Sequence, residues 1–345
     1  MIFSDEIIKW YHKNKRDLPW RNTTNPYKIW ISEIILQQTK VSQGLPYYIS
    51  FIEEFPTIID LANASEDQVL KVWQGLGYYS RARNLHFSAK TIRDNYNSQF
   101  PSEYKLIREL RGIGDYTAAA ISSFCYNLPY AVLDGNVSRV LSRYFAVDTP
   151  VDSSKGKKIL KELSQKLLNK ETPSIYNQAI MEFGALMCTP KKTDCSICPL
   201  RNSCKSFGTD LVELLPIKSK SLKITNKYFN YLIISSDKQT YLQKRTSGIW
   251  NALYQFPLIE GKLTENQIVH TKQWENIFIG STIIEKVSLK IKHKLSHQLI
   301  FTSFYHIKCD KINDSNFLKI NWSEIERYPL PILIDKYIKS VILHK

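Results

Sequence analysis

Four of the six cysteines of this chain lie in one short segment, at Cys188, Cys195, Cys198 and Cys204. Six, two and five residues separate them in turn. Thiols this dense, without a secretory signal, are typical of a metal site rather than of disulfides. Structural zinc modules usually pair two Cys-x-x-Cys knuckles across a long spacer, and this segment has only the pair Cys195 and Cys198. The spacing favours one iron–sulfur cluster held by four thiolates, with structural zinc as the alternative.

The rest of the composition describes a chain that can bury a large core. Its 345 residues suggest about two domains. No apolar run reaches the roughly 18 residues of a transmembrane helix, and Asp5 and Glu6 stand where a signal peptide would carry lysines. We therefore expect no membrane association and a reducing compartment, either a bacterial cytoplasm with its nucleoid or a eukaryotic nucleus. In such a compartment Cys125 and Cys309 are interpreted as buried apolar residues.

The net charge of +15 suits a polyanionic partner such as nucleic acid. A lysine-rich composition is the alternative explanation, because 35 of the 47 basic residues are lysines and they are scattered throughout. Charge alone therefore does not decide the partner.

Hydrophobic periodicity divides the chain. Up to about residue 205, apolar residues recur at three- and four-residue spacing, which predicts helices over 33–39, 66–73, 116–124 and 137–145. Ser65 and Gln68 resemble a capping box, and Asp115 is a candidate cap for the helix after it. A polar connector over 206–226 precedes a smaller α+β domain over 227–345. This domain has β-prone segments at 228–235 and 240–244. A second hairpin is predicted from Val287, Leu289 and Ile291, which alternate with polar neighbours, followed by a turn near 294–297 and a strand through Phe304.

Gly112 and Gly114 lie one residue apart, immediately before a predicted helix. Glycines permit close backbone approach, and the N–H groups of a helix start bind anions. A tight turn between packed helices is the alternative. The helical surroundings, over about 106–124, disfavour a dinucleotide fold and resemble a helix-hairpin-helix, which would hold a DNA phosphate independently of sequence.

Two carboxylates also have ordinary explanations when each is considered alone. Asp134, Gly135 and Asn136 would make a turn and a helix N-cap. Glu33, among apolar neighbours, could be a solvated helix position.

Taken together, these segments resemble the helix-hairpin-helix DNA glycosylases that carry a [4Fe-4S] cluster, and within them the adenine DNA glycosylase (MutY-type) branch. The resemblance spans residues from about 16 to 205 and continues more loosely to the C-terminus. Besides the hairpin and the four cysteines of the 188–204 loop, it rests on Arg16, Leu18–Arg21, Ser32–Glu33, Leu36–Thr39, Gly75–Arg81, Asp134–Asn136 and Asn177–Ala179. It implies an all-α glycosylase core over 1–205 and a Nudix (MutT)-like domain over 227–345.

By this resemblance, Glu33 donates a proton to N7 of adenine and Asp134 stabilises the sugar cation, directly or through a transient covalent link. Paired carboxylates in unequal environments perform the corresponding steps of glycoside hydrolysis. Asn136 would orient the acids, and Tyr116 would hydrogen-bond Asp134. Endonuclease III-type enzymes carry a lysine at the position of Tyr116, where the amine forms a Schiff base with the sugar. A phenol cannot, so we predict a monofunctional glycosylase that leaves the abasic strand intact.

The target base must leave the duplex to reach these acids. By resemblance Gln38 and Tyr78 are the wedges that replace it, with Leu36 and Thr39 beside them; helix surface for Gln38 and core packing for Tyr78 are the alternatives. The adenine pocket would contain Arg16, Trp20, Arg21 and Gln178, with a plain core role left open for Trp20. The implied partner of the monomer is double-stranded DNA with an 8-oxoguanine:A or G:A mispair.

The C-terminal domain follows the family around Gly248–Asn251 and Gln255–Pro257. Between Gly261 and Gly280 the only glutamates are Glu265 and Glu275, so the glutamate-rich helix of a Nudix hydrolase is missing and lesion recognition without hydrolysis is expected. The family senses the lesion with Phe-Ser-His, and this chain has Leu295, Ser296 and His297. The polar pair is kept, whereas the aromatic contact is lost.

Two other functions are compatible with parts of the pattern. One is a related glycosylase acting on thymine in T:G mispairs; Glu33, Gln178 and the Nudix-like domain favour adenine. The other is a DNA-binding iron–sulfur protein with a decayed site, which the presence of both Glu33 and Asp134 argues against.

The cysteine loop is expected to be a structural element that brings Lys191, Lys192, Arg201 and Lys205 to DNA phosphate. Glu182 is interpreted as structural.

Overall fold

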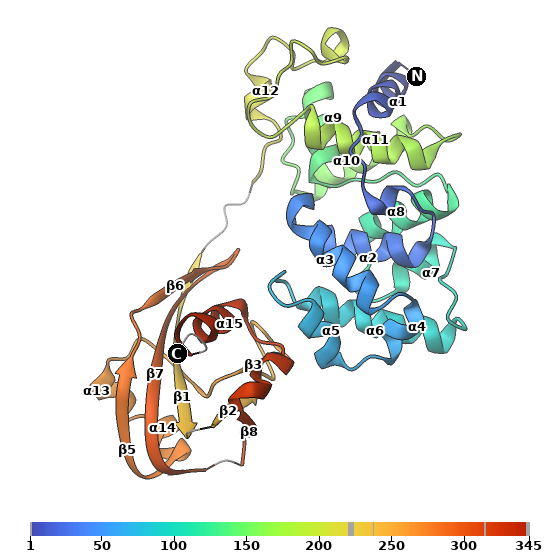
Figure 1. The fold of residues 1–345 in the computed structure, drawn as a ribbon. Helices are drawn as coiled ribbons and strands as arrows, with labels where there is room; N and C mark the ends of the chain where they lie inside the picture. Colours follow the sequence, from blue (N-terminus) through green and yellow to red (C-terminus); the bar gives the residue numbers. More distant parts are fainter. Residues whose placement is uncertain (1, 220–223, 237, 314, 343–345) are drawn as a thin grey trace. The chain divides into compact units, whose positions relative to one another are not determined.

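The structure, a computed structural model, describes residues 2–219, 224–236, 238–313 and 315–342 (Figure 1). It divides into two compact units. The first comprises Met1–Asn63 and Asn84–Ser221, and the second comprises Ala64–Arg83 and Leu222–Lys345. The segment 64–83, which the sequence places in the helical domain, therefore packs within the second unit. In the described part of the chain, no helix is long and apolar enough to cross a membrane.

The first unit is helical, as predicted. Its helices are α1 (Ile2–Asn14), α2 (Pro26–Leu36), α3 (Val41–Glu54), α4 (Ile58–Asn63), most of α6 (Ser80–Asn95), α7 (Tyr104–Glu109), α8 (Asp115–Tyr126), α9 (Gly135–Phe145), α10 (Ser154–Leu167), α11 (Pro173–Leu186) and α12 (Leu211–Leu214), with 3₁₀ turns η1 (Pro19–Arg21) and η2 (Arg201–Ser203).

Helix α2 lies at the centre of its neighbours and packs against α3 and α8 (Figure 1). Ile29, Trp30, Ile31 and Ile35 are all at most 2% exposed. A helix that is apolar on every side is a core helix, so its one acid, Glu33, is buried with it. The solvated position considered for Glu33 from the sequence is therefore wrong.

Helices α9 and α11 form a second packing centre, in which α11 contacts α1, α8 and α9. Val137, Val140 and Leu141 of α9 pack with Tyr176 and Phe183 of α11 in one core. The beginning and end of α9 are both fixed by local chemistry, because Asp134 is its N-cap and Ala146 ends it in the left-handed conformation. The start of α9 is thereby placed against α11.

Among its described residues, the second unit contains one sheet of eight strands, with the path β3-β2-β1-β7-β5. The strands are β1 (Thr225–Ser236), β2 (Gln239–Lys244), β3 (Tyr254–Gln255), β4 (Leu258–Glu260), β5 (Phe278–Val287), β6 (Ile291–Lys294), β7 (Gln298–Ile312) and β8 (Leu318–Asn321). Its helices are α5 (Glu66–Val72), α13 (Glu265–Ile268), α14 (Lys272–Ile277), α15 (Ile332–Tyr337) and the short turns η3 (Trp322–Arg327) and η4 (Ile338–Ile342).

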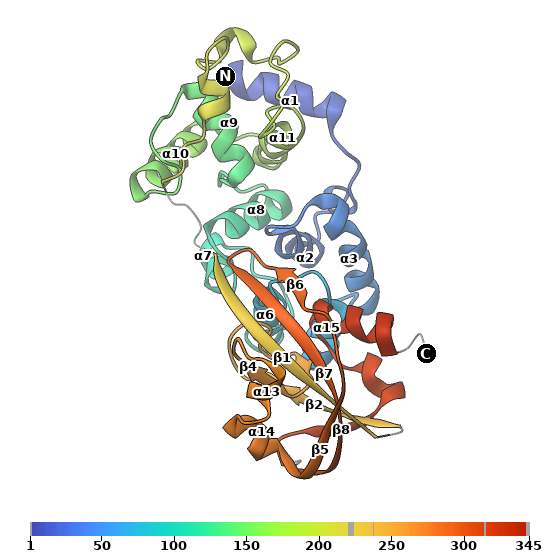
Figure 2. The same ribbon diagram turned by 90° about the vertical axis from the view of Figure 1, so that its left-hand side faces the viewer.

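Strand β1 runs beside β7 in the parallel sense, as Figure 2 shows for the two longest strands. Successive residues of β1 are buried on both faces of the sheet. Leu232 and Ile234 pack with Ile268 and Trp274, whereas the ring of Tyr231 stacks on Phe304 at 5.4 Å. A central strand covered on both sides explains the continuous apolar run in the sequence.

Both predicted hairpins are present, with one change of boundary. Ser235 pairs with Thr240 at the first turn, and β6 pairs antiparallel with β7 at the second. Val287 ends β5 and does not belong to the strand that contains Ile291. The capping box of Ser65 and Gln68 is formed at the start of α5.

Candidate active site

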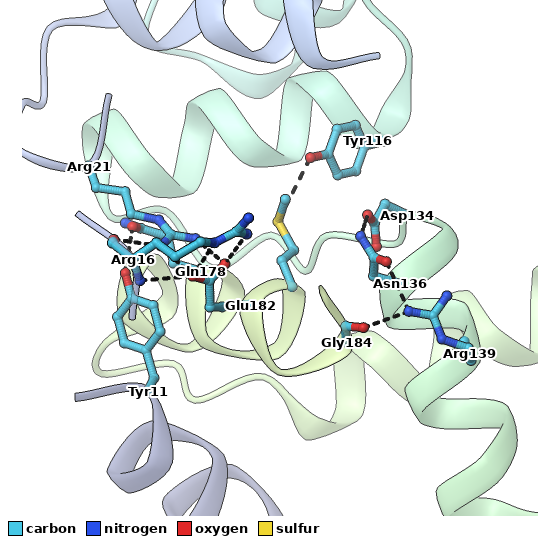
Figure 3. A network of polar contacts seen from close by, with 11 residues as sticks. Tyr11, Arg16, Arg21, Tyr116, Asp134, Asn136, Arg139, Gln178, Glu182 and Gly184 are labelled. Carbon is cyan, nitrogen blue, oxygen red and sulfur yellow. Dashed lines mark hydrogen bonds and ion pairs between the residues drawn. The ribbon is translucent and has the colours of Figure 1, made fainter. Parts of the chain in front are cut away.

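Several elements of the first unit bring the predicted catalytic residues together. Helix α2 carries Glu33, the first turn of α8 carries Tyr116, and the N-cap of α9 is Asp134. Helix α11 packs against α8 and α9 and supplies Gln178 and Glu182, whose polar contacts Figure 3 shows. Residues far apart in the sequence therefore meet because α2, α8, α9 and α11 pack as neighbours.

Glu33 is only 6% exposed. Burial disfavours the carboxylate and raises the pKa of Glu33 to about 7, although a hydrogen bond from Tyr116 lowers it in part and the nearby charge of Asp134 raises it further. An acid with such a pKa is about half protonated at neutral pH and more fully below it, so it can act as a proton donor.

The carboxylate of Asp134 is held by two hydrogen bonds. Its Oδ1 accepts from the backbone N–H of Val137 at 2.7 Å, and its Oδ2 accepts from Nδ2 of Asn136 at 2.9 Å. Burial raises the pKa of Asp134, while these hydrogen bonds and the positive charge of Arg139 oppose that rise. The bonds stabilise the ionised form, which is the form that could face a cation. The turn-and-cap interpretation of Asp134–Asn136 is thus confirmed, and it fixes the carboxylate in place.

Tyr116 lies between the two acids. Its hydroxyl donates to Sδ of Met181, with the oxygen 3.8 Å from the sulfur. Burial, together with the charges of Glu33 and Asp134, raises the pKa of Tyr116, so the phenol stays neutral. The expected hydrogen bond from Tyr116 to Asp134 is not found among the described residues, because the hydroxyl interacts with Glu33 and Met181 instead.

The predicted adenine pocket is organised by Glu182, whose importance the sequence does not reveal. Its carboxylate is 1% exposed and accepts from Nη2 of Arg16 at 2.6 Å and from Nη2 of Arg21 at 2.7 Å. Burial opposes its charge, but the two guanidinium groups outweigh burial and lower the pKa of Glu182 to about 2. Glu182 therefore stays ionised and fixes both arginines (Figure 3).

The other two pocket candidates are held separately. Oε1 of Gln178 accepts from the hydroxyl of Tyr11 at 3.0 Å. Trp20 lies in η1 and packs edge-on against Tyr48, with ring centroids 5.1 Å apart. Trp20 is half-buried, which suits either a pocket wall or plain packing.

Arg139 links Asp134 to the cysteine segment. Its guanidinium donates to Oδ1 of Asn136 at 3.0 Å, to the carbonyl of Gly184 at 2.6 Å and to the carbonyl of Cys188 at 2.8 Å (Figure 3). A Cβ at Gly184 would lie 2.8 Å from Cβ of Asn136, so only glycine permits this approach. The chain Asp134–Asn136–Arg139–Cys188 was not predicted. The sequence feature that could have indicated this link is the four-residue spacing of Arg139 and Arg143, which places them on one face of α9. The structure buries both side chains.

The four clustered cysteines converge on one place. Together they line a cavity of about 30 Å³ beneath α9 and α11. Arg143 closes one side, donating to the carbonyl of Thr189 at 2.7 Å and approaching Sγ of Cys188 at 3.5 Å. Among the described residues, no three metal-binding side chains are gathered as closely as one ion requires. What the structure offers is a small cavity that all four cysteines line.

The hairpin between α7 and α8 has the geometry that its glycines predict. Gly112 has φ +85°, and a Cβ there would lie 2.8 Å from Cβ of Asn84, whereas nothing obstructs Gly114. The cap expected at Asp115 is wrong, because Gly114 is the N-cap of α8. The carboxylate of Asp115 instead forms ion pairs with Arg108 and, at 3.0 Å, with Lys161. Two cations therefore neutralise the acid that would otherwise repel a phosphate.

The predicted wedges both have unusual backbone. Gln38 and Tyr78 are non-glycine residues with φ of +56° and +50°, a conformation that costs free energy and is enriched at functional sites. Gln38 is exposed just beyond α2, between Leu36 and Thr39. Tyr78 is 41% exposed, so the core role considered for it is wrong.

In the second unit, the hydroxyl of Tyr78 forms a short hydrogen bond with Oγ of Ser296. Ser296 and His297 lie in the turn between β6 and β7, which the bond from the N–H of Leu295 to the carbonyl of Gln298 closes at 2.8 Å. Two residues that were predicted to touch DNA separately are thus in contact with each other.

Comparisons with known proteins agree with this arrangement. Residues 31–170 match the model of the HhH-GPD superfamily base excision DNA repair protein, and residues 230–340 match that of the NUDIX domain. An adenine DNA glycosylase of Buchnera aphidicola subsp. Baizongia pistaciae is 36% identical over 354 residues, covering 99% of this chain and 97% of that protein. The chain belongs to the adenine DNA glycosylase family.

Other relatives match part of this glycosylase. The human adenine DNA glycosylase is 38% identical over 213 residues, which cover 59% of this chain and 39% of that protein. A solved thermostable thymine-DNA glycosylase superposes with a TM-score of 0.56 at 28% identity, over 60% of this chain and 95% of that one. These findings confirm the predicted family and its combination of a helix-hairpin-helix core with a Nudix-like domain.

Proposed function

We propose that this glycosylase hydrolyses the N-glycosidic bond of adenine mispaired with 8-oxoguanine or guanine in double-stranded DNA. One observation carries the proposal: Glu33 is buried with its pKa raised to about 7, beside an Asp134 whose carboxylate accepts two hydrogen bonds. Cleavage leaves positive charge on the sugar and negative charge on the base. One acid must therefore be protonated and the other ionised, as in glycoside hydrolysis.

The chemistry follows from these two positions. After the adenosine is flipped out, Glu33 donates its proton to N7 while the C1′–N9 bond breaks and its electron pair moves to the base. The carboxylate of Asp134 stabilises the cation at C1′, held in place by Asn136 and the N–H of Val137. Water then adds to C1′ and gives a proton to the carboxylate of Glu33. Neutral adenine and an abasic sugar are the products.

The same residues support a monofunctional enzyme. Tyr116 occupies the position from which a lysine would attack the sugar, and its raised pKa keeps the phenol neutral. We expect the abasic strand to remain intact until alkali is added. Strand cleavage at neutral pH, without added base or amine, would contradict this part of the proposal.

Arg16, Trp20, Arg21 and Gln178 form the proposed adenine pocket. The guanidinium groups of Arg16 and Arg21 are already oriented by Glu182, so little side-chain entropy is lost when the base enters. Gln38, with Leu36 and Thr39 beside it, and Tyr78 are proposed to occupy the space that the base leaves. Gly112 and Gly114 would hold a backbone phosphate.

A [4Fe-4S] cluster fits the cavity lined by Cys188, Cys195, Cys198 and Cys204. All four cysteines line one cavity, and four cysteine thiolates are the ligand set of a [4Fe-4S] cluster. When bound, the cluster would tie the 188–204 loop to α9 and α11 and supply no step of base release. Equal amounts of iron and acid-labile sulfide in the purified protein would support it, and stoichiometric zinc with no sulfide would contradict it.

The C-terminal domain is proposed to read the base opposite adenine. Ser296 and His297 lie at one turn, and the contact with Tyr78 brings a candidate wedge to that turn. Replacing Ser296 and His297 together with alanine should reduce the preference for 8-oxoguanine over guanine opposite adenine. Unchanged discrimination would reject this role.

One experiment tests the whole proposal. Single-turnover base release is measured on 8-oxoguanine:A, G:A and G:T duplexes, with and without alkali. Wild-type protein should release adenine from the first two, and Glu33→Gln should abolish release while DNA binding persists. Glu53→Gln, on the exposed face of α3, is the matched control and should be fully active. Release of thymine from G:T, or an active Glu33→Gln variant, would overturn the assignment.

A further inference from the structure

Apart from Tyr116, the residues of a large open cleft in the first unit have no role in the reaction described so far. It has a volume of about 900 Å³ and lies between α8 and α10. Asp115 and Tyr116 of α8 line one side, lysines of α10 line the other, and the segment that contains Tyr130, Ala131 and Leu133 closes it. We call it the α8–α10 cleft.

The charge of the cleft is positive. Lys157 and Lys166 of α10, and Lys170 beyond it, line the cleft and are exposed. None of the three forms an ion pair with any residue that the structure describes. The two acids on the cleft are already paired, Asp115 with Lys161 and Glu162 with Lys158. Uncompensated lysines around a concave surface attract a polyanion.

The cleft also carries aromatic surface. The rings of Tyr104 and Tyr130 are stacked, with centroids 4.2 Å apart and planes 16° from parallel. Tyr130 is 36% exposed. Lysines interleaved with exposed tyrosine rings are typical of surfaces that follow a nucleic-acid strand.

The wall of the cleft leads directly to the candidate catalytic acid. The segment 129–133, which precedes Asp134, is clamped to α10. Nε2 of Gln165 donates to the carbonyl of Pro129 at 2.9 Å, the N–H of Ala131 donates to Oε1 of Gln165 at 3.0 Å, and Oγ of Ser164 donates to the carbonyl of Val132 at 2.9 Å. The wall of the cleft is therefore continuous in sequence with Asp134, the N-cap of α9.

We propose that the α8–α10 cleft binds the phosphodiester backbone of the DNA strand that carries the target adenine, with Lys157, Lys166 and Lys170 on its phosphates. The inference rests on the proposed function and adds to it a second backbone contact, on α10, next to the helix-hairpin-helix. Such contacts carry no sequence information and serve to set position. A small phosphorylated ligand is the other occupant that the same chemistry would accept, and the experiment distinguishes the two.

The first test is the salt dependence of DNA binding. Each lost phosphate contact should reduce the slope of log K against log salt by about 0.9, so Lys157→Gln/Lys166→Gln should lower it by nearly 2. Lys157→Arg/Lys166→Arg keeps both positive charges and should have the wild-type slope. The control Lys13→Gln/Lys155→Gln removes the same charge from exposed positions outside the cleft. An equal loss of slope in the control pair would overturn the proposal.

The second test locates the strand. Neutral methylphosphonate linkages are placed one at a time along either strand of an 8-oxoguanine:A duplex. In wild-type protein, certain positions on the adenine strand should weaken binding several-fold, and Lys157→Gln/Lys166→Gln should abolish that penalty. Penalties confined to the opposite strand, or unchanged in the variant, would overturn the proposal. The proposal would also be overturned if wild-type protein binds deoxyadenosine monophosphate and Lys157→Gln/Lys166→Gln loses that binding while the salt dependence of its DNA binding stays normal.

These results remain separable from the proposed function. Adenine release is measured in the same samples. If wild-type protein releases no adenine, the proposed function fails. If it releases adenine and the lysine variants bind DNA with unchanged slope, the α8–α10 cleft assignment alone fails.

Discussion

At the scale of single residues, the site depends on three acids in three environments. Glu33 is surrounded by apolar residues, Asp134 accepts hydrogen bonds at a helix start, and Glu182 is paired with two arginines. Burial raises the pKa of Glu33 and Asp134, whereas ion pairing lowers that of Glu182. In the proposed mechanism the same functional group therefore serves as a proton donor at Glu33, as an anion at Asp134 and as a structural charge at Glu182.

The raised pKa of Glu33 predicts the pH dependence of base release. Because the protonated acid is required, the single-turnover rate should fall about tenfold per pH unit above about 7. The stability of the fold should also decrease as pH rises. Because the pKa of Glu33 is higher in the folded state than in the unfolded one, its contribution to the free energy of unfolding is fully present below about pH 4.5 and is lost as pH rises through about 7. Glu33→Gln should remove this slope from the free energy of unfolding. A rate that rises across pH 7 to 8 would contradict Glu33 as the donor.

Glu182 yields a second prediction at this scale. Glu182→Gln leaves Arg21, whose side chain is 13% exposed, without its counter-charge. We expect a loss of about 3 kcal/mol in the free energy of unfolding, as for other broken buried pairs, together with weakened adenine release. Denaturant unfolding monitored by circular dichroism measures the first effect. The control is Glu162→Gln on α10, which removes only an exposed pair 4.0 Å long and should change stability by less than about 1 kcal/mol.

At the scale of elements, what the sequence predicts is what lies close together along the chain. The cap at Asp134, the glycine turn at Gly112 and the helix through Glu33 follow from local spacing. The partners of Arg16 and Arg139 do not, because Glu182 and Cys188 are 166 and 49 residues away. Arginines on a helix normally indicate a solvated face, and only the packing of α9 against α11 turns Arg139 inward.

Arg139 yields the prediction at this scale. It joins the helix of Asp134 to the cysteine segment through Asn136, Gly184 and Cys188. Arg139→Gln should slow single-turnover adenine release at least tenfold and lower the iron content, and Arg139→Lys should not rescue either, because an ammonium lacks the planar fork. Arg93→Gln, which removes an exposed pair with Asp94, is the control. Normal iron content and rate in Arg139→Gln would show that the link is only structural packing.

At the scale of the whole molecule, the sequence indicates two parts, and the match to the helix-hairpin-helix family runs through 64–83, whereas in the structure this segment packs within the second unit. Periodicity assigns 64–83 to the helical domain because α5 is a regular amphipathic helix with a capping box. Its polar partners, however, are C-terminal: Asp67 accepts from Lys244 at 2.7 Å and from the hydroxyl of Tyr254 at 2.9 Å. Long-range pairs of this kind leave no periodic trace. The covalent order of the helices therefore differs from the order in which they pack.

This placement makes Asp67 a test of how the second unit is held together. Asp67→Ala should increase hydrogen exchange of 64–83 and, because Tyr78 lies in that segment and contacts Ser296, reduce discrimination between 8-oxoguanine and guanine opposite adenine. Adenine release from G:A should change little, since Glu33 and Asp134 lie in the first unit. Glu66→Ala removes the neighbouring carboxylate of α5 and is the matched control. If 64–83 stays as protected in Asp67→Ala as in the control, the segment is anchored by other contacts and its polar link to the C-terminal domain does not govern lesion recognition.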